Sequence, residues 1–243
     1  MAKRSDGTPA PADQTGRTAV SSRPEIDAFL EQLRAMPAAS PGKRGRLVFA
    51  LDATMSRQPT WDSACRLQAD MFNEAAAIGG LDVQLVYFRG LSECRASRWV
   101  GDPRHLGALM ERIDCRGGHT QIGKVLAHAR KEAEQGRIAA LVYVGDAMEE
   151  AIDDLCVPAG ELGLLGVPAF VFHEGDDPIA EQAFREIARL SRGAYCRFSA
   201  GAAHELGELL RAAAAYAAGG MKALDDLSAK RNAGAIKLLA QMR

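Results

Sequence analysis

The sequence predicts an α/β fold, in which a doubly wound, mostly parallel sheet of six strands has helices on both faces, as in Rossmann-like domains. Short, continuously apolar runs recur along the chain, and such runs are typical of parallel strands that are buried on both faces. The longer segments between them have apolar residues at helical spacing. With 47% hydrophobic and 25% charged residues, the 243-residue chain is long enough for one well-buried domain.

Composition and periodicity divide the chain into four parts. Residues 1–23 are rich in Pro, Gly, Ser, Thr and charge, so we expect them to be disordered. Residues 24–43 are expected to form a helix that begins at a proline, followed by a linker. The predicted domain spans residues 44–218, and residues 219–243 form an amphipathic helical tail. The apolar residues of this tail are Leu224, Leu227, Leu238 and Met242.

The first half of the domain contains three of the expected strands. Residues 47–51 have the length and bulk of a buried central strand. The helix expected over residues 61–76 has one apolar stripe and ends before a pair of glycines. A second strand at residues 83–88 follows at once, and weaker alternation at residues 92–100 predicts an edge strand. Two further helices are expected, over residues 103–115 and 122–133.

The second half repeats the alternation of strand and helix. The apolar run at residues 139–144 predicts another fully buried strand. A short helix is expected to begin at Glu149, and Pro158 is expected to restart a helix towards residue 165. The remaining predicted elements are a strand at 169–172, a helix at 179–190, a strand at 195–198 and a helix at 206–217.

Three polar stretches that are distant in sequence are expected to meet at one edge of this sheet. Ligands of doubly wound sheets bind beyond the carboxyl ends of the strands, where the winding reverses. If the strand order is 3-2-1-4-5-6, the first and fourth strands are neighbours, and Asp52 and Asp146 follow them directly. The helix that leads into the fourth strand runs opposite to it, which brings Thr120 to the same edge.

The side chains at this edge supply oxygen atoms only. The candidate ligands are Asp52, Thr54, Ser56, Thr120 and Asp146. Two carboxylates and three hydroxyls suit a hard cation such as Mg²⁺, or Mn²⁺ in its place, whereas zinc prefers cysteine and histidine ligands. Neutral hydroxyls leave such a metal able to accept one more oxygen, which an Asp or Glu from outside would supply.

These residues resemble the von Willebrand factor type A (VWA) domain with its metal-ion-dependent adhesion site (MIDAS). The family pattern is Asp-x-Ser-x-Ser after the first strand, a Thr in a glycine-containing loop and an Asp after the fourth strand. The matching stretches are Asp52-Ala-Thr54-Met-Ser56, Gly117-Gly118-His-Thr120-Gln-Ile-Gly123 and Asp146. The resemblance spans about residues 44 to 218; Thr54 stands in place of the more usual Ser, and Ala147 in place of a frequent Gly.

The resemblance implies a protein-binding module in which a partner's Asp or Glu completes the coordination of the metal. In that family the hydroxyls bind the metal directly, and the carboxylates do so directly or through water. Asp62, Glu149 and Glu150 are either outer groups of the site or exposed acids at helix starts, and the second interpretation is favoured.

Two alternative functions are weighed against this one. A metal-dependent hydrolase or phosphatase could use Asp52 as a nucleophile, but phosphatases of the haloacid-dehalogenase type need a second Asp where this chain has Thr54. Neither a Gly-x-Ser-x-Gly elbow nor a phosphate-binding loop is present, so we predict that the chain is not an enzyme. In the other alternative, a metal-free scaffold would bind a partner's groove through its terminal helices.

Charge and cysteine content exclude several other classes. A net charge of −1 and a pI near 6.5 leave no electrostatic basis for binding nucleic acid or an anionic membrane. Because no stretch reaches the ~18 apolar residues of a membrane helix, we expect a cytoplasmic protein. Five cysteines without a Cys-x-x-Cys pair argue against disulfides and structural zinc, and Cys65, Cys156 and Cys196 are expected to be buried.

Overall fold

A computed structural model describes residues 44–242 of the chain. Their six strands form a single sheet in the order β3-β2-β1-β4-β5-β6, which confirms the predicted order. Every neighbouring pair is parallel except β2 and β3, which are antiparallel. The strands are β1 (Gly45–Asp52), β2 (Leu81–Arg89), β3 (Glu93–Ala96), β4 (Ala140–Gly145), β5 (Ala169–Glu174) and β6 (Ala194–Phe198). The disordered tail and the helix with its linker, predicted for residues 1–43, lie outside the described residues.

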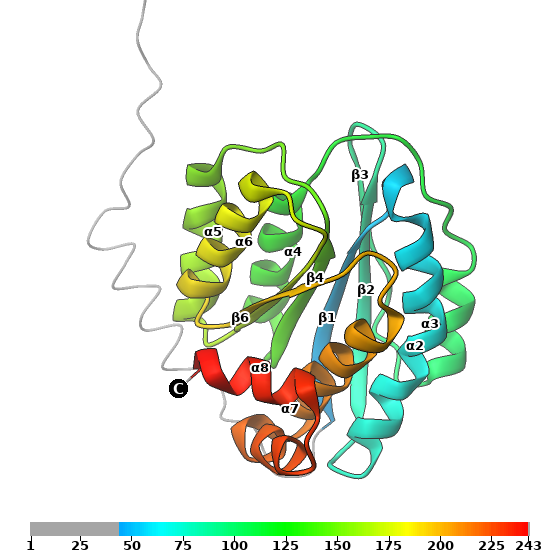
Figure 1. The fold of residues 1–243 in the computed structure, drawn as a ribbon, viewed down its shortest axis with the longest axis vertical. Helices are drawn as coiled ribbons and strands as arrows, with labels where there is room; N and C mark the ends of the chain where they lie inside the picture. Colours follow the sequence, from blue (N-terminus) through cyan, green and yellow to red (C-terminus); the bar gives the residue numbers. More distant parts are fainter. Residues whose placement is uncertain (1–43, 243) are drawn as a thin grey trace, which may run out of the picture. The chain divides into compact units, whose positions relative to one another are not determined.

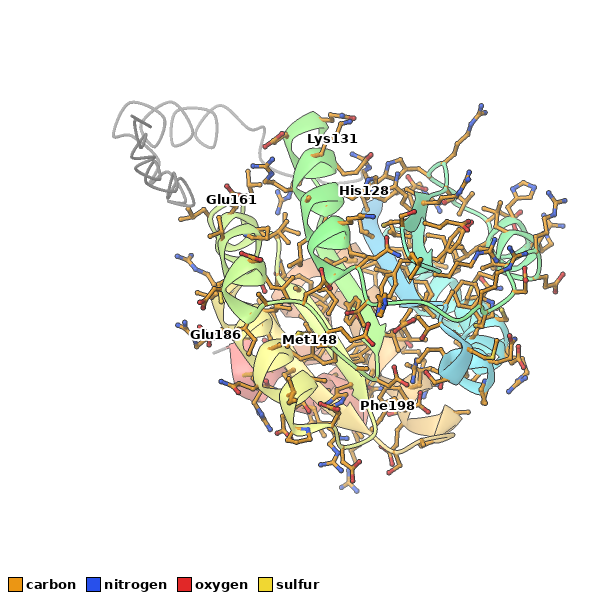
Figure 2. All side chains as sticks on the ribbon, turned by 90° about the horizontal axis from the view of Figure 1, so that it is seen from above. His128, Lys131, Met148, Glu161, Glu186 and Phe198 are labelled. Carbon is orange, nitrogen blue, oxygen red and sulfur yellow. The ribbon has the colours of Figure 1, made fainter. Side chains whose placement is uncertain are left out.

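Helices cover both faces of the sheet, as predicted (Figure 1). One face packs against α2 (Gln58–Ala76), α3 (Pro103–Met110), α7 (Ala203–Ala229) and α8 (Ala233–Met242). The other face packs against α4 (Ile122–Gln135), α5 (Ile152–Leu164) and α6 (Pro178–Leu190). Figure 2 shows α4 and α5 side by side, with His128 labelled on the first and Glu161 on the second. Arg130 of α4 forms an ion pair with Glu161 at 3.2 Å.

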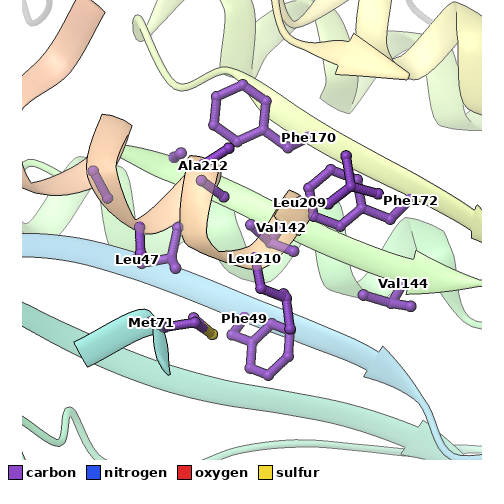
Figure 3. Packing of buried hydrophobic residues seen from close by; sticks show 14 of the residues in the cluster. Leu47, Phe49, Met71, Val142, Val144, Phe170, Phe172, Leu209, Leu210 and Ala212 are labelled. Atoms are coloured by element: carbon purple, nitrogen blue, oxygen red, sulfur yellow. The ribbon is translucent and has the colours of Figure 1, made fainter. Parts of the chain in front are cut away.

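The central strand β1 is buried on both faces, which explains its continuous apolar run. Leu47 and Phe49 point to the face covered by α2 and α7, whereas Val48 and Ala50 point to the face covered by α4 and α5. Figure 3 shows the first side packed against Met71, Val142, Phe170, Phe172, Leu209 and Leu210. Burying a large apolar side chain stabilises the fold by roughly 1.5–3 kcal/mol, so this contact holds β1, and the loop that follows it, in place.

Two helix boundaries differ from the prediction. The helix α3 ends at Met110 rather than at residue 115, because the chain there turns back to the sheet, where the Arg116 amide donates to the Ala53 carbonyl. The helix α5 begins at Ile152, after Glu149, and continues through Pro158 as one helix. Apolar side chains are buried both before and after this proline, and their burial outweighs the roughly 3 kcal/mol cost of a proline in a helix.

The C-terminal segment packs on the domain rather than projecting from it. The helix α7 continues past residue 217, where it was expected to end, and kinks at Gly220, which has a φ of 66°. Leu224, Leu227 and Leu238 are buried in the same core as the sheet. The Gln241 amide donates to the Tyr195 carbonyl of β6. In this structure the apolar face of the tail is therefore covered by its own domain, while the domain limit at residue 218 stays a prediction.

Two other sequence expectations have mixed outcomes. Cys196 is buried as predicted, but Cys65 and Cys156 are only partly buried. Cys65 lines a surface pocket, and Cys156 lies within α5 next to the exposed Val157. All five cysteines, which lie within the described range, are free thiols. Across residues 44–242, no helix has the length and hydropathy needed to span a bilayer.

Candidate metal centre

A pocket of about 240 Å³ lies where β1 and β4 end, at the edge predicted from the strand order. All five predicted ligands line it: Asp52, Thr54, Ser56, Thr120 and Asp146. Met55, Gly117, Gly118, Ala147 and Glu149 complete the lining. The structure thus brings together three stretches that are far apart in the sequence, and the role of these residues as metal ligands stays a prediction.

Asp52 is the last residue of β1, and its side chain is only 2% exposed. Its Oδ1 atom accepts a hydrogen bond of 2.7 Å from the Thr54 backbone amide, which fixes the carboxylate against the turn that follows. Burial raises the pKa of Asp52 to about 6, hydrogen bonds from Thr54 oppose this rise, and the negative charge of Asp146 adds to it. The positive charge of Arg57 also lowers the pKa of Asp52, but burial outweighs it.

Asp146 follows β4 and connects the two strand ends. The Ser56 hydroxyl donates to its Oδ2 atom at 2.9 Å, so the loops after β1 and β4 contact each other through two predicted ligands. Two buried oxygens of the site, Asp52 Oδ2 and Asp146 Oδ1, have no hydrogen-bond partner among residues 44–242. Buried carboxylate oxygens without a partner are costly, and such groups are ordinarily paired or bound to a metal.

Thr120 lies two residues before α4, in the loop that also contains Gly117 and Gly118. Its hydroxyl accepts a hydrogen bond from the Glu149 amide at 3.0 Å, and its own amide donates to the Glu149 carboxylate at 3.0 Å. A Cβ atom on Gly118 would lie 2.2 Å from the Gly90 carbonyl oxygen, so the loop packs closely against the tip of the β2–β3 hairpin. These contacts hold the Thr120 hydroxyl at the pocket.

Glu149 is exposed, as the favoured interpretation expected, but neither acid after β4 begins a helix, because α5 starts at Ile152. Glu149 binds the Thr120 loop and lines the pocket. Glu150 accepts hydrogen bonds from the Ile122 and Gly123 amides, and so it satisfies free donors at the N-terminus of α4. Asp62 fits the favoured interpretation, because its exposed carboxylate binds the Gln58 side chain within α2.

A buried ion pair lies beside the pocket, and the sequence analysis did not identify it. The Arg57 guanidinium is 2% exposed and pairs with Glu174, the last residue of β5. The same Nη1 atom of Arg57 lies 3.8 Å from Asp146 Oδ2. Two signals could have pointed to this pair: Arg57 directly follows a predicted ligand, and Glu174 ends the strand next to β4.

The residues at the pocket fit a hard divalent cation. Within residues 44–242, no group of three His, Cys, Asp or Glu side chains is arranged to hold a metal, so a cation here would depend on hydroxyl ligands as well. Two carboxylates with unpartnered oxygens and three hydroxyls give an all-oxygen donor set, which is the chemistry of Mg²⁺ and not of structural zinc.

Sequence comparisons find no relative: no family model and no curated protein matches the chain. Solved structures do match its fold. The VWA domain of SpRpn10 is 12% identical with a TM-score of 0.51, and the match covers 65% of this chain and 89% of that one. Proximal thread matrix protein 1 from the mussel byssus, solved with a zinc-occupied MIDAS motif, is 15% identical with a TM-score of 0.52; the match covers 74% and 50%.

A third similar structure is the human COPII-coat protein Sec24c, which is 9% identical with a TM-score of 0.50; the match covers 72% of this chain and 32% of that one. The chain spans about half of the byssus protein and a third of the coat protein. Identities this low show the fold alone. Together with the strand order and the covering helices, they show that the chain has the fold of von Willebrand factor type A domains.

Proposed function

We propose that the chain is a protein-interaction module that binds a divalent cation and, through it, an acidic residue of a partner protein. The cation is Mg²⁺, with Mn²⁺ as a substitute, and the proposed ligands are Asp52, Thr54, Ser56, Thr120 and Asp146. The observation that carries this proposal is the pair of unpartnered buried oxygens, Asp52 Oδ2 and Asp146 Oδ1, in two side chains that line one pocket. A bound cation would give both atoms a partner.

The ligand set explains why the partner should supply a carboxylate. Three of the five proposed ligands are neutral hydroxyls, so a divalent cation would keep part of its charge and favour an anionic oxygen at its remaining position. Met55 lines the same pocket and is 68% exposed. An exposed apolar side chain beside a charged centre supports a protein partner, because such a partner can cover it while its acid binds the metal.

The two alternative functions have less support. A hydrolase that used Asp52 as its nucleophile would also need a general acid. Among the described residues that line the pocket, the only other titratable side chains are Asp146 and Glu149, and both already accept hydrogen bonds, from the Ser56 hydroxyl and the Thr120 amide. A scaffold that binds through its C-terminal helix would need the apolar face of Leu224 and Leu238, which is buried in the domain core. We therefore propose a module that is not an enzyme. The cytoplasmic location expected from the sequence stays a prediction.

A pull-down with the full chain as bait tests this function. Partner capture in the presence of Mg²⁺ should be lost on adding EDTA and on the Thr120→Ala substitution, which removes one oxygen without changing charge. Thr120→Ser is the matched control, because it keeps the hydroxyl, and it should retain capture. Capture that survives both EDTA and Thr120→Ala would show that the interface does not involve the metal site.

A further inference from the structure

The buried ion pair of Arg57 and Glu174 lies beside the proposed metal site. Arg57 ends the short 3-10 helix at Met55–Arg57, directly after the proposed ligand Ser56. Its guanidinium is buried, and burying an arginine is costly unless an anion pairs with it. Glu174 supplies that anion and is itself held on both oxygens, by the Arg57 guanidinium and the Thr60 hydroxyl on Oε2 and by the Gly201 amide on Oε1.

The same guanidinium also faces a proposed metal ligand. Its Nη1 atom lies 3.8 Å from Asp146 Oδ2, the oxygen that accepts the Ser56 hydroxyl. Arg57 thus has two carboxylates within reach, one in direct contact and one slightly farther away. Among residues 44–242, neither Arg57 nor Glu174 lines the pocket. Arg57 therefore acts on the site through its charge, which affects Asp146 at 3.8 Å and also Asp52.

A fixed positive charge at this place opposes a divalent cation. Electrostatic interactions over a few ångströms are strong where water is excluded, and two cations that approach the same carboxylate repel each other. Glu174 reduces this opposition, because it neutralises the guanidinium and holds it away from Asp146. The charge of Glu174 should therefore affect the affinity of the site for the metal, although its side chain does not line the pocket.

We propose that Arg57 is a competing cation built into the site and that Glu174 is the positioning residue that sets how strongly Arg57 competes. This inference rests on the proposed function, since it assigns the residues that tune the affinity of the same site. Binding of metal and pairing of Arg57 with Asp146 are then linked, so that each weakens the other.

Four proteins test the inference by calorimetric titration with Mg²⁺ after removal of metal by a chelator: wild type, Glu174→Gln, Arg57→Met and the double variant. Glu174→Gln should weaken Mg²⁺ binding by about tenfold or more, because the guanidinium loses its nearer anion and turns to Asp146. The double variant lacks both charges, so its affinity should return to the wild-type value or exceed it. Far-UV circular dichroism and melting without metal check that each protein folds.

The recovery in the double variant separates the inference from a merely structural role. If Glu174→Gln weakened binding by loosening the fold, removal of Arg57 as well would not restore it, and that result would overturn the inference. Unchanged affinity in Glu174→Gln would overturn it too, while leaving the proposed function intact. Absence of Mg²⁺ binding in all four proteins would refute both. Should Glu174→Gln fail to fold, Thr60→Val removes one hydrogen bond to Glu174 and should weaken binding in the same direction.

Discussion

Replacing Asp52 by Asn should stabilise the metal-free protein while it destroys the proposed metal site. Burial raises the pKa of the Asp52 carboxyl from its ordinary value of 3.8 to about 6. Between these two values the folded state binds more protons at this group than the unfolded state, so stability falls as the pH rises through this window. Each pKa unit corresponds to about 1.4 kcal/mol, so above pH 6 the ionised carboxylate costs the fold about 3 kcal/mol.

Asn has the same shape without the charge, and its Oδ1 atom can still accept the hydrogen bond from the Thr54 amide. With EDTA present at pH 7.5, the free energy of unfolding of Asp52→Asn should therefore exceed that of the wild type by up to about 3 kcal/mol. Near pH 4 the carboxyl of the folded wild type is protonated, and the difference should largely vanish. Urea denaturation at both pH values measures these differences.

Saturating Mg²⁺ should then reverse the order of stability at pH 7.5. A ligand at one thousand times its Kd stabilises the folded state by about 4.1 kcal/mol, which exceeds the deficit of about 3 kcal/mol, and only the wild type would gain this stabilisation. Two results would refute the reasoning: an Asp52→Asn protein that is less stable than the wild type in EDTA at pH 7.5, or a stability difference that is the same at both pH values.

Three further predictions concern the surroundings of the site. Met55→Ser should weaken partner binding without changing Mg²⁺ affinity, because Met55 is exposed at the pocket rim, and paired pull-down and calorimetry measure the two effects. Gly118→Val should lower both the melting temperature and Mg²⁺ affinity, because its side chain would collide with the Gly90 backbone. Leu238→Asp should destabilise the domain by roughly 3–5 kcal/mol, because it places a charge in the buried core. Urea denaturation measures this loss of stability.

The sequence was sufficient to predict the sheet because the strand signals are local and strong. The apolar run of β1 and the runs of β4 and β5 match their predicted limits within a few residues. Asp52 and Asp146 could then be placed together, since the strand order makes β1 and β4 neighbours. The Thr120 loop followed from the same topology. The order and direction of the strands place these residues at one edge of the sheet. The apolar pattern of the sequence predicts where the strands lie, and so it predicts this placement as well.

The sequence could not predict contacts that depend on how loops fold over the sheet edge. Glu149 and Glu150 looked like the start of a helix, but the Thr120 amide binds the Glu149 carboxylate and the Ile122 amide binds that of Glu150. The helix begins three residues after Glu149, at Ile152. The pairing of Arg57 with Glu174 spans more than a hundred residues and leaves no periodic trace. Pro158 predicted a break in α5, but tertiary packing outweighed this local signal.

The most direct test of the central claim is a calorimetric titration of Mg²⁺ into the full chain after a chelator has removed bound metal. We expect one binding site per chain, lost in both Asp52→Ala and Asp146→Ala. The matched control Asp153→Ala removes an exposed carboxylate from α5 outside the pocket, and it should bind as the wild type does. Absence of binding in the wild type, or binding that persists in Asp52→Ala, would contradict the account.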